Sequence, residues 1–274
     1  MPDPAALSRV ARLQAISPER HRESEPLFDD GLPRHYGGRS LAQAVRAAGL
    51  TVDEAMVVHS VHASFLAGGE VGVPVELAVA SLRDGRSFAT RGVDSWQGAS
   101  RVLQAMVSFH RPERGDEWDP HPDRPLPPLP AGRASGVVSP LAGFEIRAEH
   151  GVSERGWPRH PYWFRTVDRV DDDPRVHECL LAYVSDAGLV WASRRLGTAG
   201  LVDRQLASLD HAMWFHRRPR VDEWMVCEAE PVVNTGARGL TSARIRDADG
   251  RLVASVMQET LFRPGPGGPR VAGA

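Results

Sequence analysis

A proline-rich segment divides the chain of 274 residues into two stretches of similar length. Residues 112–140 contain eight prolines. Because proline fixes φ and has no backbone N–H group, this segment cannot form a regular helix or an inner strand. We interpret it as an extended linker between a first unit, residues 1–111, and a second unit, residues 141–263. Residues 264–274, PGPGGPRVAGA, are predicted to be a disordered tail.

The two units follow the same order of predicted elements, one helix and then four strands. In the first unit the stretches are GGRSLAQAVRAAGL, VVHSVHASFL, VELAVASL, RDGRSFATRGVDSWQ and SRVLQAMVSFHR. In the second unit they are LLAYVSDAGLVWASRR, ASLDHAMWFHRR, WMVCEAEPVV, ARGLTSARIRDADG and RLVASVMQETLFR. The helical stretches have apolar residues at helical spacing, whereas the strand stretches alternate or run apolar around Asp-Gly turns.

A further strand is predicted to open the second unit, at YWFRTV, residues 162–167, and its counterpart in the first unit is weak. A single helix with an antiparallel sheet wrapped around it buries the apolar faces of both elements. We therefore expect an α+β fold that consists of two tandem units, each with one central helix and one antiparallel sheet.

The charge and the composition exclude several classes of function. The formal net charge is −2, and all 33 basic residues are arginine. Without lysine, the chain has neither a Schiff-base lysine nor a Walker phosphate loop. A negative net charge gives no long-range attraction for nucleic acid or for an anionic membrane, so we expect neither partner.

Targeting and metal-binding patterns are absent from the sequence. The N-terminal residues lack the apolar core of a signal peptide, and no stretch approaches the roughly 18 apolar residues of a membrane-spanning helix. Cys179 and Cys227 have neither metal-ligand nor redox spacing, and no histidine–carboxylate cluster has the spacing of a zinc site. We therefore expect a cytoplasmic protein with two buried, reduced cysteines and no metal.

Eight short stretches resemble the acyl-CoA thioesterase II family in sequence and in order. They are YGGRSLAQA, VHSVHASFL, SLRDGRSFATR, LAYVSD, LDHAMWFHR, DEWMVCEAE, ARG and VASVMQE, and they are spread over most of residues 36–263. The resemblance implies a double hotdog fold and hydrolysis of fatty acyl-CoA to free acid and CoA, with water as the nucleophile and without a cofactor. It also implies a homodimer.

The resemblance implies a catalytic role for three residues. The family's aspartate matches Asp186 of LAYVSD, its glutamine matches Gln258 of VMQE, and its threonine matches Ser208 of ASLDH. Serine keeps the hydroxyl group but loses the methyl group that restricts the rotamer. A carboxylate can accept the proton of an attacking water, while a hydroxyl and an amide hold that water in place. We expect Asp186 in the middle of a buried helix, where it needs polar partners.

Substrate contacts are predicted at the start of the first helix. Gly37 and Gly38 form a turn before that helix, and free backbone amides there can stabilise a thioester oxygen as it gains charge. A glycine pair is also common in plain turns. Arg83, Arg86 and Arg91 can meet CoA phosphates by charge-assisted hydrogen bonds, although a solvated hairpin is the favoured explanation for each of them taken singly.

The repeat suggests two further residues. Aligning HASF with HAMW places His59 opposite Ser208, and aligning the two helices places Gln43 opposite Asp186. We expect Gln43 and His59 to line the pocket from the first unit, with a structural histidine as the alternative. Because a carboxylate stands in the second unit alone, this alignment predicts one active site per chain.

The stretch ASLDHAMWFHRRP contains a serine, an aspartate and two histidines, yet most of it is predicted to be scaffold. Adjacent strand residues point to opposite faces, so Asp210 and His211 cannot converge unless a bulge intervenes, whereas Ser208 and Asp210 share a face. We interpret His211 as an interior residue with satisfied hydrogen bonds. A covalent role for Ser208 is disfavoured because nucleophilic serines usually lie on a strand-to-helix elbow such as G-x-S-x-G.

Two other functions remain open at this point. A hydratase or dehydratase that acts on enoyl-CoA in the same fold would need an aspartate and a histidine converging on one water, and Asp210 and His59 are the plausible pair. A non-catalytic acyl-CoA binding protein is the second alternative, because fold does not fix function.

Overall fold

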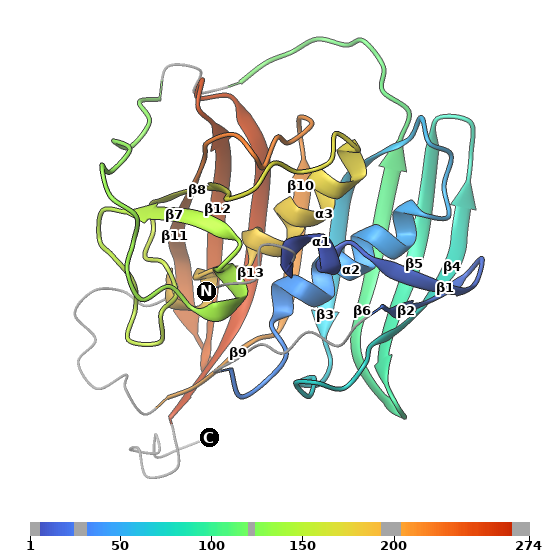
Figure 1. Ribbon diagram of the computed structural model, residues 1–274, viewed down its shortest axis with the longest axis horizontal. Coiled ribbons are helices and arrows are strands. Elements are labelled where there is room, and N and C mark those ends of the chain that lie inside the picture. The colour runs from blue at the N-terminus through green and yellow to red at the C-terminus, as the bar shows by residue number, and fades with distance from the viewer. Residues whose placement is uncertain (1–5, 25–31, 120–123, 193–203, 265–274) are drawn as a thin grey trace.

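The computed structural model describes residues 6–24, 32–119, 124–192 and 204–264, and the strands among them form one antiparallel sheet. The strand order is β1-β2-β4-β5-β6-β3-β10-β13-β12-β11-β8-β7, with β9 also pairing with β13. Helices α2 (Gly37–Gly49) and α3 (Pro174–Ser185) pack against each other on one face of this sheet (Figure 1). Strands of the first unit make up one half of the sheet, and strands of the second unit make up the other.

The first unit contains six strands and a short helix besides α2. These are α1 (Ala6–Val10), β1 (Leu13–Ser17), β2 (Arg20–Glu23), β3 (Val57–Phe65), β4 (Glu76–Asp84), β5 (Phe88–Gln97) and β6 (Ser100–His110). The second unit adds η1 (Ser139–Leu141), β7 (Phe144–Ala148), β8 (Tyr162–Thr166), α4 (Leu189–Ala192), β9 (Arg204–Ser208), β10 (Asp210–Phe215), β11 (Met225–Thr235), β12 (Arg238–Asp247) and β13 (Leu252–Pro264). The predicted α+β fold of two helix-and-sheet units is confirmed.

The units are joined at the centre of the sheet, where β3 pairs with β10. His211 lies opposite Ala63, and Met213 lies opposite Val61. Both pairs are buried, so side chains from the two units meet on the helix side of the sheet. This junction makes the hydrophobic core continuous from one unit to the other.

Helix α2 is buried around almost its whole circumference, because it lies between the sheet and α3. Alanines at 42, 44, 47 and 48 let the neighbouring elements approach closely. The thiol of Cys179, on α3, donates a hydrogen bond of 3.3 Å to the carbonyl oxygen of Ala42. Both cysteines are buried and free.

Several elements extend the predicted pattern. The hairpin β1–β2 lengthens the sheet beyond β4, and β7 lengthens it beyond β8. In the proline-rich segment, residues 112–119 and 124–138 have no helix or strand, its last two residues begin the short 3-10 helix η1, and residues 120–123 lie outside the described residues. Most of the predicted tail, residues 265–274, also lies outside them, and Pro264 ends β13. Among the described helices, none combines the length and the apolar character needed to cross a membrane.

Candidate active site

The sequence predicted Asp186 in the middle of a helix, and this prediction is wrong, because Asp186 lies at the end of one. It is the C-cap residue of α3, and the chain turns before α4 begins at Leu189. Gly188 permits this turn, because its φ is +78° and a Cβ there would lie 2.5 Å from the carbonyl oxygen of Pro158. Apolar periodicity continues across the break, which explains why it predicted one long helix.

The N-terminus of α2 faces this carboxylate. Its N-cap residue, Tyr36, makes no side-chain cap hydrogen bond, and the backbone amide of Gly38 bonds to Asp186 instead. Asp186 therefore caps α2 from the neighbouring helix. The glycine pair is needed for this approach: a Cβ on Gly37 would lie 2.9 Å from Asp186 Oδ2, and one on Gly38 would lie 2.1 Å from the carbonyl oxygen of Tyr183.

Tyrosine hydroxyls satisfy carbonyl oxygens around the end of α3. The bonds run from Tyr36 Oη to Tyr183 O at 2.9 Å, and from Tyr162 Oη to Val184 O at 3.2 Å and to Ala187 O at 3.3 Å. Helix ends leave such carbonyl groups short of backbone donors, and Val184 O also accepts from the backbone amide of Ala187 at 3.0 Å. Neutral donors thus fix the turn that carries Asp186.

A β-bulge places Ser208 and His211 on the same side of their strand. The flanking cross-strand pairs are Ser208 with Thr260 and Ala212 with Met257. Three residues therefore lie between these pairs on the β9–β10 side, and two lie between them on β13. The extra residue reverses the usual alternation, so Ser208 and His211 both reach the side chain of Gln258.

Gln258 is fully buried and connects the polar groups of the site. Its amide nitrogen donates to Ser208 Oγ at 2.9 Å, and its amide oxygen lies 2.7 Å from His211 Nδ1. Its side chain also hydrogen bonds to the carboxylate of Asp186. The structure thus brings together Asp186, Ser208 and Gln258, the three residues carried over by the family resemblance.

Two predictions for the neighbouring residues have different outcomes. His211 is an interior residue with satisfied hydrogen bonds, as predicted, because Ser185 Oγ lies 3.0 Å from its Nε2 and Gln258 lies at its Nδ1. The sequence did not indicate that this histidine contacts the candidate site. Asp210 does not join Ser208 at Gln258, because the bulge breaks the alternation, and its Oδ1 accepts a hydrogen bond from the backbone amide of Glu259 at 2.8 Å.

Burial sets the protonation of the site. It raises the pKa of Asp186 to about 7, and hydrogen bonds from Gln258 and Gly38 offset part of this rise. Burial also lowers the pKa of His211 to about 4, so its imidazole is neutral near pH 7. Asp186 Oδ1 has no hydrogen-bond partner among the residues that the structure describes. A buried carboxylate that titrates near neutral pH, with one free oxygen, can act as a general base.

A cavity of about 630 Å³ reaches Asp186, Ser208 and Gly37. Its walls come from the loop before α2, the end of β3 and the residues after it, the start of β6, the segment between β7 and β8, α4 with the turn before it, and strand β9. Large apolar side chains on these walls are Leu32, Phe65, Leu66, Val102, Trp157, Val190, Trp191 and Leu206. Arg34 and Arg155 also line the cavity. An apolar cavity with a few polar groups at one place is typical of a small-molecule site.

Gln43 and His59 are not brought into this cavity. Gln43 is buried in the middle of α2, where its Nε2 donates to Glu23 Oε1 at 3.0 Å. The ring of His59 packs against Phe88 and His110, with centroid distances of 6.0 and 5.7 Å. Neither residue lines the cavity at Asp186.

The register of the sheet gives a different correspondence between the units. His62 is exposed and His211 is buried, so the HASF and HAMW stretches face opposite sides when they are aligned. Between β3 and β9–β10, a shift of 150 residues restores matching faces and also matches the bulge at His59 with the one after Ser208. The neighbouring strands and the helices are then matched through their cross-strand partners and their C-caps. Corresponding positions are then Val58 and Ser208, Val61 and His211, Val107 and Gln258, and the helix C-caps Leu50 and Asp186.

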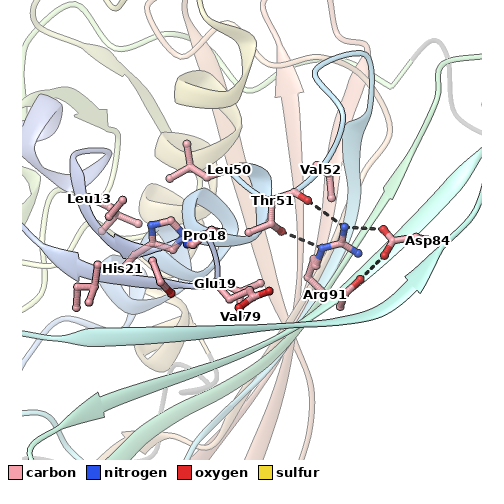
Figure 2. A pocket seen from close by; sticks show the side chains of 14 residues that line it. Leu13, Pro18, Glu19, His21, Leu50, Thr51, Val52, Val79, Asp84 and Arg91 are labelled. Atoms are coloured by element: carbon pink, nitrogen blue, oxygen red, sulfur yellow. Dashed lines mark hydrogen bonds and ion pairs between the residues drawn. The ribbon is translucent and has the colours of Figure 1, made fainter.

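A larger cavity, about 1020 Å³, lies at the other end of α2, beside the β1–β2 hairpin (Figure 2). Arg91 lines it but is engaged in internal bonds, donating to Thr51 Oγ1 at 2.9 Å, to Thr51 O at 3.0 Å and to Asp84 Oδ1 at 2.6 Å. Arg91 therefore ties the β4–β5 hairpin to the end of α2. Neither Arg83 nor Arg86 lines the cavity at Asp186. In the described part of the chain, no group of three or more metal-ligating side chains could hold a metal ion.

Two helix-and-sheet units in one continuous sheet, with a buried carboxylate where the two helices meet, define a double hotdog protein. A hot-dog-fold protein from Alicyclobacillus acidocaldarius shares the fold, with a TM-score of 0.77 at 14% identity over 95% of this chain and 99% of that chain. The family model for the acyl-CoA thioesterase N-terminal domain matches residues 28–110, and the model for the C-terminal domain matches residues 121–262. The chain belongs to the acyl-CoA thioesterase family.

Individual relatives agree with this assignment. Acyl-CoA thioesterase 2 of Haemophilus influenzae is 30% identical over 86% of this chain and 90% of its own length. Human acyl-coenzyme A thioesterase 8 is 30% identical over 88% of this chain and 87% of its own length. The crystal structure of an acyl-CoA thioesterase II from Mycobacterium marinum has a TM-score of 0.81 at 30% identity, over 97% of this chain and 100% of that chain.

Proposed function

We propose that this protein hydrolyses acyl-CoA thioesters to free acid and CoA by general-base activation of water. The observation that carries the proposal is the buried Asp186, which lines a cavity of about 630 Å³, has a pKa near 7, and has one oxygen without a hydrogen-bond partner among the described residues. The names of the relatives, acyl-CoA thioesterases in each case, support the same substrate class.

The reaction needs one proton acceptor that later returns the proton. Asp186 takes a proton from water as the water oxygen bonds to the thioester carbonyl carbon, which gives a tetrahedral oxyanion. The oxyanion then collapses, the carbon–sulfur bond breaks, and the proton on Asp186 passes to the departing thiolate. The products are the carboxylic acid and CoA thiol, and the carboxylate of Asp186 is regenerated.

Ser208 and Gln258 orient the reactants. Gln258 donates to Ser208 Oγ, which leaves the Ser208 hydroxyl proton available to the cavity. A hydroxyl donor directed at the carbonyl oxygen or at the water fixes the geometry of attack. Gly37 begins α2 and lines the cavity, so its backbone amide, which has no partner within the helix, is a second donor for the oxyanion. Gly38 instead holds Asp186.

Arg34 and Arg155 are the cationic side chains that line the cavity. We assign them to the CoA phosphates, because charge-assisted hydrogen bonds from guanidinium groups suit phosphate oxygens. This assignment replaces Arg83, Arg86 and Arg91, which lie at the β4–β5 hairpin. The apolar walls, which include Phe65 and Leu206, suit the acyl chain.

A thiol-release assay tests the proposal directly. We expect the wild type to release free thiol from acyl-CoA and Asp186→Asn to bind the same ester without releasing thiol. An enoyl-CoA that is hydrated faster than it is cleaved would instead favour the hydratase alternative, for which the structure shows no contact between Asp210 and His59 among the described residues. Hydroxylamine trapping of an acyl group on Ser208 would replace the water mechanism with a covalent one.

Two further expectations belong to the proposal. We infer a homodimer in the cytoplasm, as the family resemblance implies. Light scattering coupled to size-exclusion chromatography should give twice the chain mass of 29.9 kDa, and a mass equal to one chain would remove the dimer. Fractionation of the producing cell should recover thiol-release activity in the cytoplasmic fraction.

A further inference from the structure

His211 is the polar residue at the centre of the site whose function the reaction scheme does not yet use. It is 1% exposed and lies between two elements, with Gln258 of β13 at its Nδ1 and Ser185 of α3 at its Nε2. It does not line the cavity, so it acts on the reaction through its neighbours, of which Gln258 contacts both Ser208 and Asp186.

The donors and acceptors around Gln258 determine how its amide must point. An ionised Asp186 only accepts hydrogen bonds, so Gln258 must present its NH₂ group to that carboxylate. The same NH₂ group supplies the bond to Ser208 Oγ. The amide oxygen is then left facing His211 Nδ1 at 2.7 Å, and it can only accept. His211 must therefore carry a proton on Nδ1.

The protonation of the other ring nitrogen of His211, Nε2, follows from the same matching of donors to acceptors. Burial keeps the imidazole neutral near pH 7, so a proton on Nδ1 leaves Nε2 as an acceptor. Ser185 Oγ lies 3.0 Å from Nε2 and 2.9 Å from the carbonyl oxygen of Ala182. That hydroxyl donates to the Ala182 carbonyl oxygen in the structure. Because it has one proton, a bare Nε2 accepts a hydrogen bond only if the hydroxyl turns toward Nε2 instead.

We propose that His211, as the neutral Nδ1–H tautomer, is a positioning residue that fixes the amide orientation of Gln258 and thereby the direction of the Ser208 hydroxyl proton. This role rests on the proposed function, in which Asp186 is the base. With the amide reversed, the oxygen of Gln258 would face the carboxylate and would accept the Ser208 proton. Asp186 would then lose a donor, and the cavity would lose the hydroxyl proton.

Nitrogen-15 NMR of the histidine rings tests the tautomer without any turnover. The ring signals of His211 are assigned by their loss in His211→Asn, and the shifts of a neutral ring distinguish the protonated nitrogen from the bare one. We expect Nδ1 to be protonated at pH 7.5. A proton on Nε2 would overturn the proposal.

Two substitutions test the effect on catalysis. The side-chain NH₂ group of asparagine occupies nearly the place of Nδ1, so His211→Asn should keep the bond to Gln258, whereas His211→Gln moves its donor toward the place of Nε2 and should lose it. We expect His211→Asn to stay within a few-fold of wild-type kcat, and His211→Gln to lose roughly tenfold to a hundredfold in kcat with little change in KM.

The pH dependence separates positioning from a structural role. Loss of the Gln258 donor removes a bond that lowers the pKa of Asp186, so the acid limb of the kcat profile should move to higher pH in His211→Gln and stay in place in His211→Asn. Equal kcat and equal profiles in the two folded variants would overturn the positioning role. Full turnover in Asp186→Asn would defeat the proposed function while leaving the NMR result standing, so the two failures are distinguishable.

Discussion

The two units share one backbone plan but differ at the four positions that form the site. In the second unit these positions are Asp186, Ser208, His211 and Gln258, and in the first unit they are Leu50, Val58, Val61 and Val107. Both units have a bulge at the strand that meets the partner unit. The fold therefore provides two equivalent places for a site, and the side chains make one of them polar and the other aliphatic.

The helix ends differ in the same way. At the end of α3, neutral tyrosine hydroxyls satisfy carbonyl groups, and Asp186 accepts a bond from Gly38. Beyond the end of α2, the guanidinium group of Arg175 donates to the carbonyl oxygens of Val52 at 3.3 Å and Asp53 at 2.7 Å. Cations stabilise the negative end of a helix, whereas a carboxylate there is destabilised. The second unit thus keeps a charge that burial disfavours, and that the bonds from Gly38 and Gln258 offset only in part, at the position where the proposed chemistry needs one.

The largest effect that the comparison predicts is the loss of turnover in Asp186→Asn. Asparagine keeps the size of the side chain but cannot accept a proton from water, so kcat should fall by about 10²–10⁴. The measurement is thiol release under saturating acyl-CoA, together with equilibrium binding of the same ester to show that the cavity is intact.

Glu178 supplies the matched control for that loss. It is also a buried carboxylate on α3 with a pKa raised to about 7 by burial, but its backbone partner is Val58 of the first unit. Glu178→Gln should therefore keep wild-type turnover. If both substitutions abolished thiol release, the loss would not be specific to Asp186, and its role as the base would be contradicted.

Ser208→Ala should give the next largest effect. Removal of the hydroxyl leaves the NH₂ group of Gln258 without one acceptor and removes a donor from the cavity, so kcat should fall roughly tenfold to a hundredfold. Ser208→Thr should stay close to the wild type, since threonine keeps the hydroxyl. Val58→Thr, at the corresponding position of the first unit, should leave kcat unchanged, and a change of similar size there would contradict a single site per chain.

The sequence predicts the order of elements in both units because strand alternation and helical spacing are local patterns. It predicts Asp186, Ser208 and Gln258 because three short motifs resemble a family. It places Asp186 wrongly within a helix, because the turn at Gly188 depends on contact with Pro158. It pairs His59 with Ser208 wrongly, because the shared letters His-Ala in HASF and HAMW suggest an alignment of the two strands. That alignment places an exposed residue opposite a buried one and does not match the two bulges. Such features follow from contacts between distant segments.

Substitution of Arg34 and Arg155 tests whether the CoA phosphates bind at the cavity beside Asp186 or at the hairpin of the first unit. Both line the cavity of the polar site, so Arg34→Gln and Arg155→Gln should each raise KM roughly threefold to tenfold with little change in kcat. Added salt should weaken substrate binding to the wild type more than binding to the variants, because salt screens the attraction between phosphate and an arginine that only the wild type has. Arg86→Gln, at the hairpin of the first unit, should leave KM unchanged, and an equal rise there would move the phosphate contacts to the first unit.

The smallest effect is on stability, and its sign depends on pH. Burial raises the pKa of Asp186 to about 7 from 3.8, so between these values the folded state binds more protons than the unfolded state, and stability falls as pH rises through 7. Asp186→Asn should therefore raise Tm at pH 8, by roughly 2–4 °C for each kcal/mol recovered, and raise it less at pH 5, where only part of the range between the two pKa values has been crossed. Glu178→Gln should change Tm in the same way, since burial also raises the pKa of Glu178 to about 7.

Differential scanning calorimetry of the wild type and the variants at the two pH values measures these changes in Tm. A lower Tm at pH 8 in Asp186→Asn would mean that the ionised carboxylate stabilises the fold. The charge of Asp186 would then not lower the stability of the second unit.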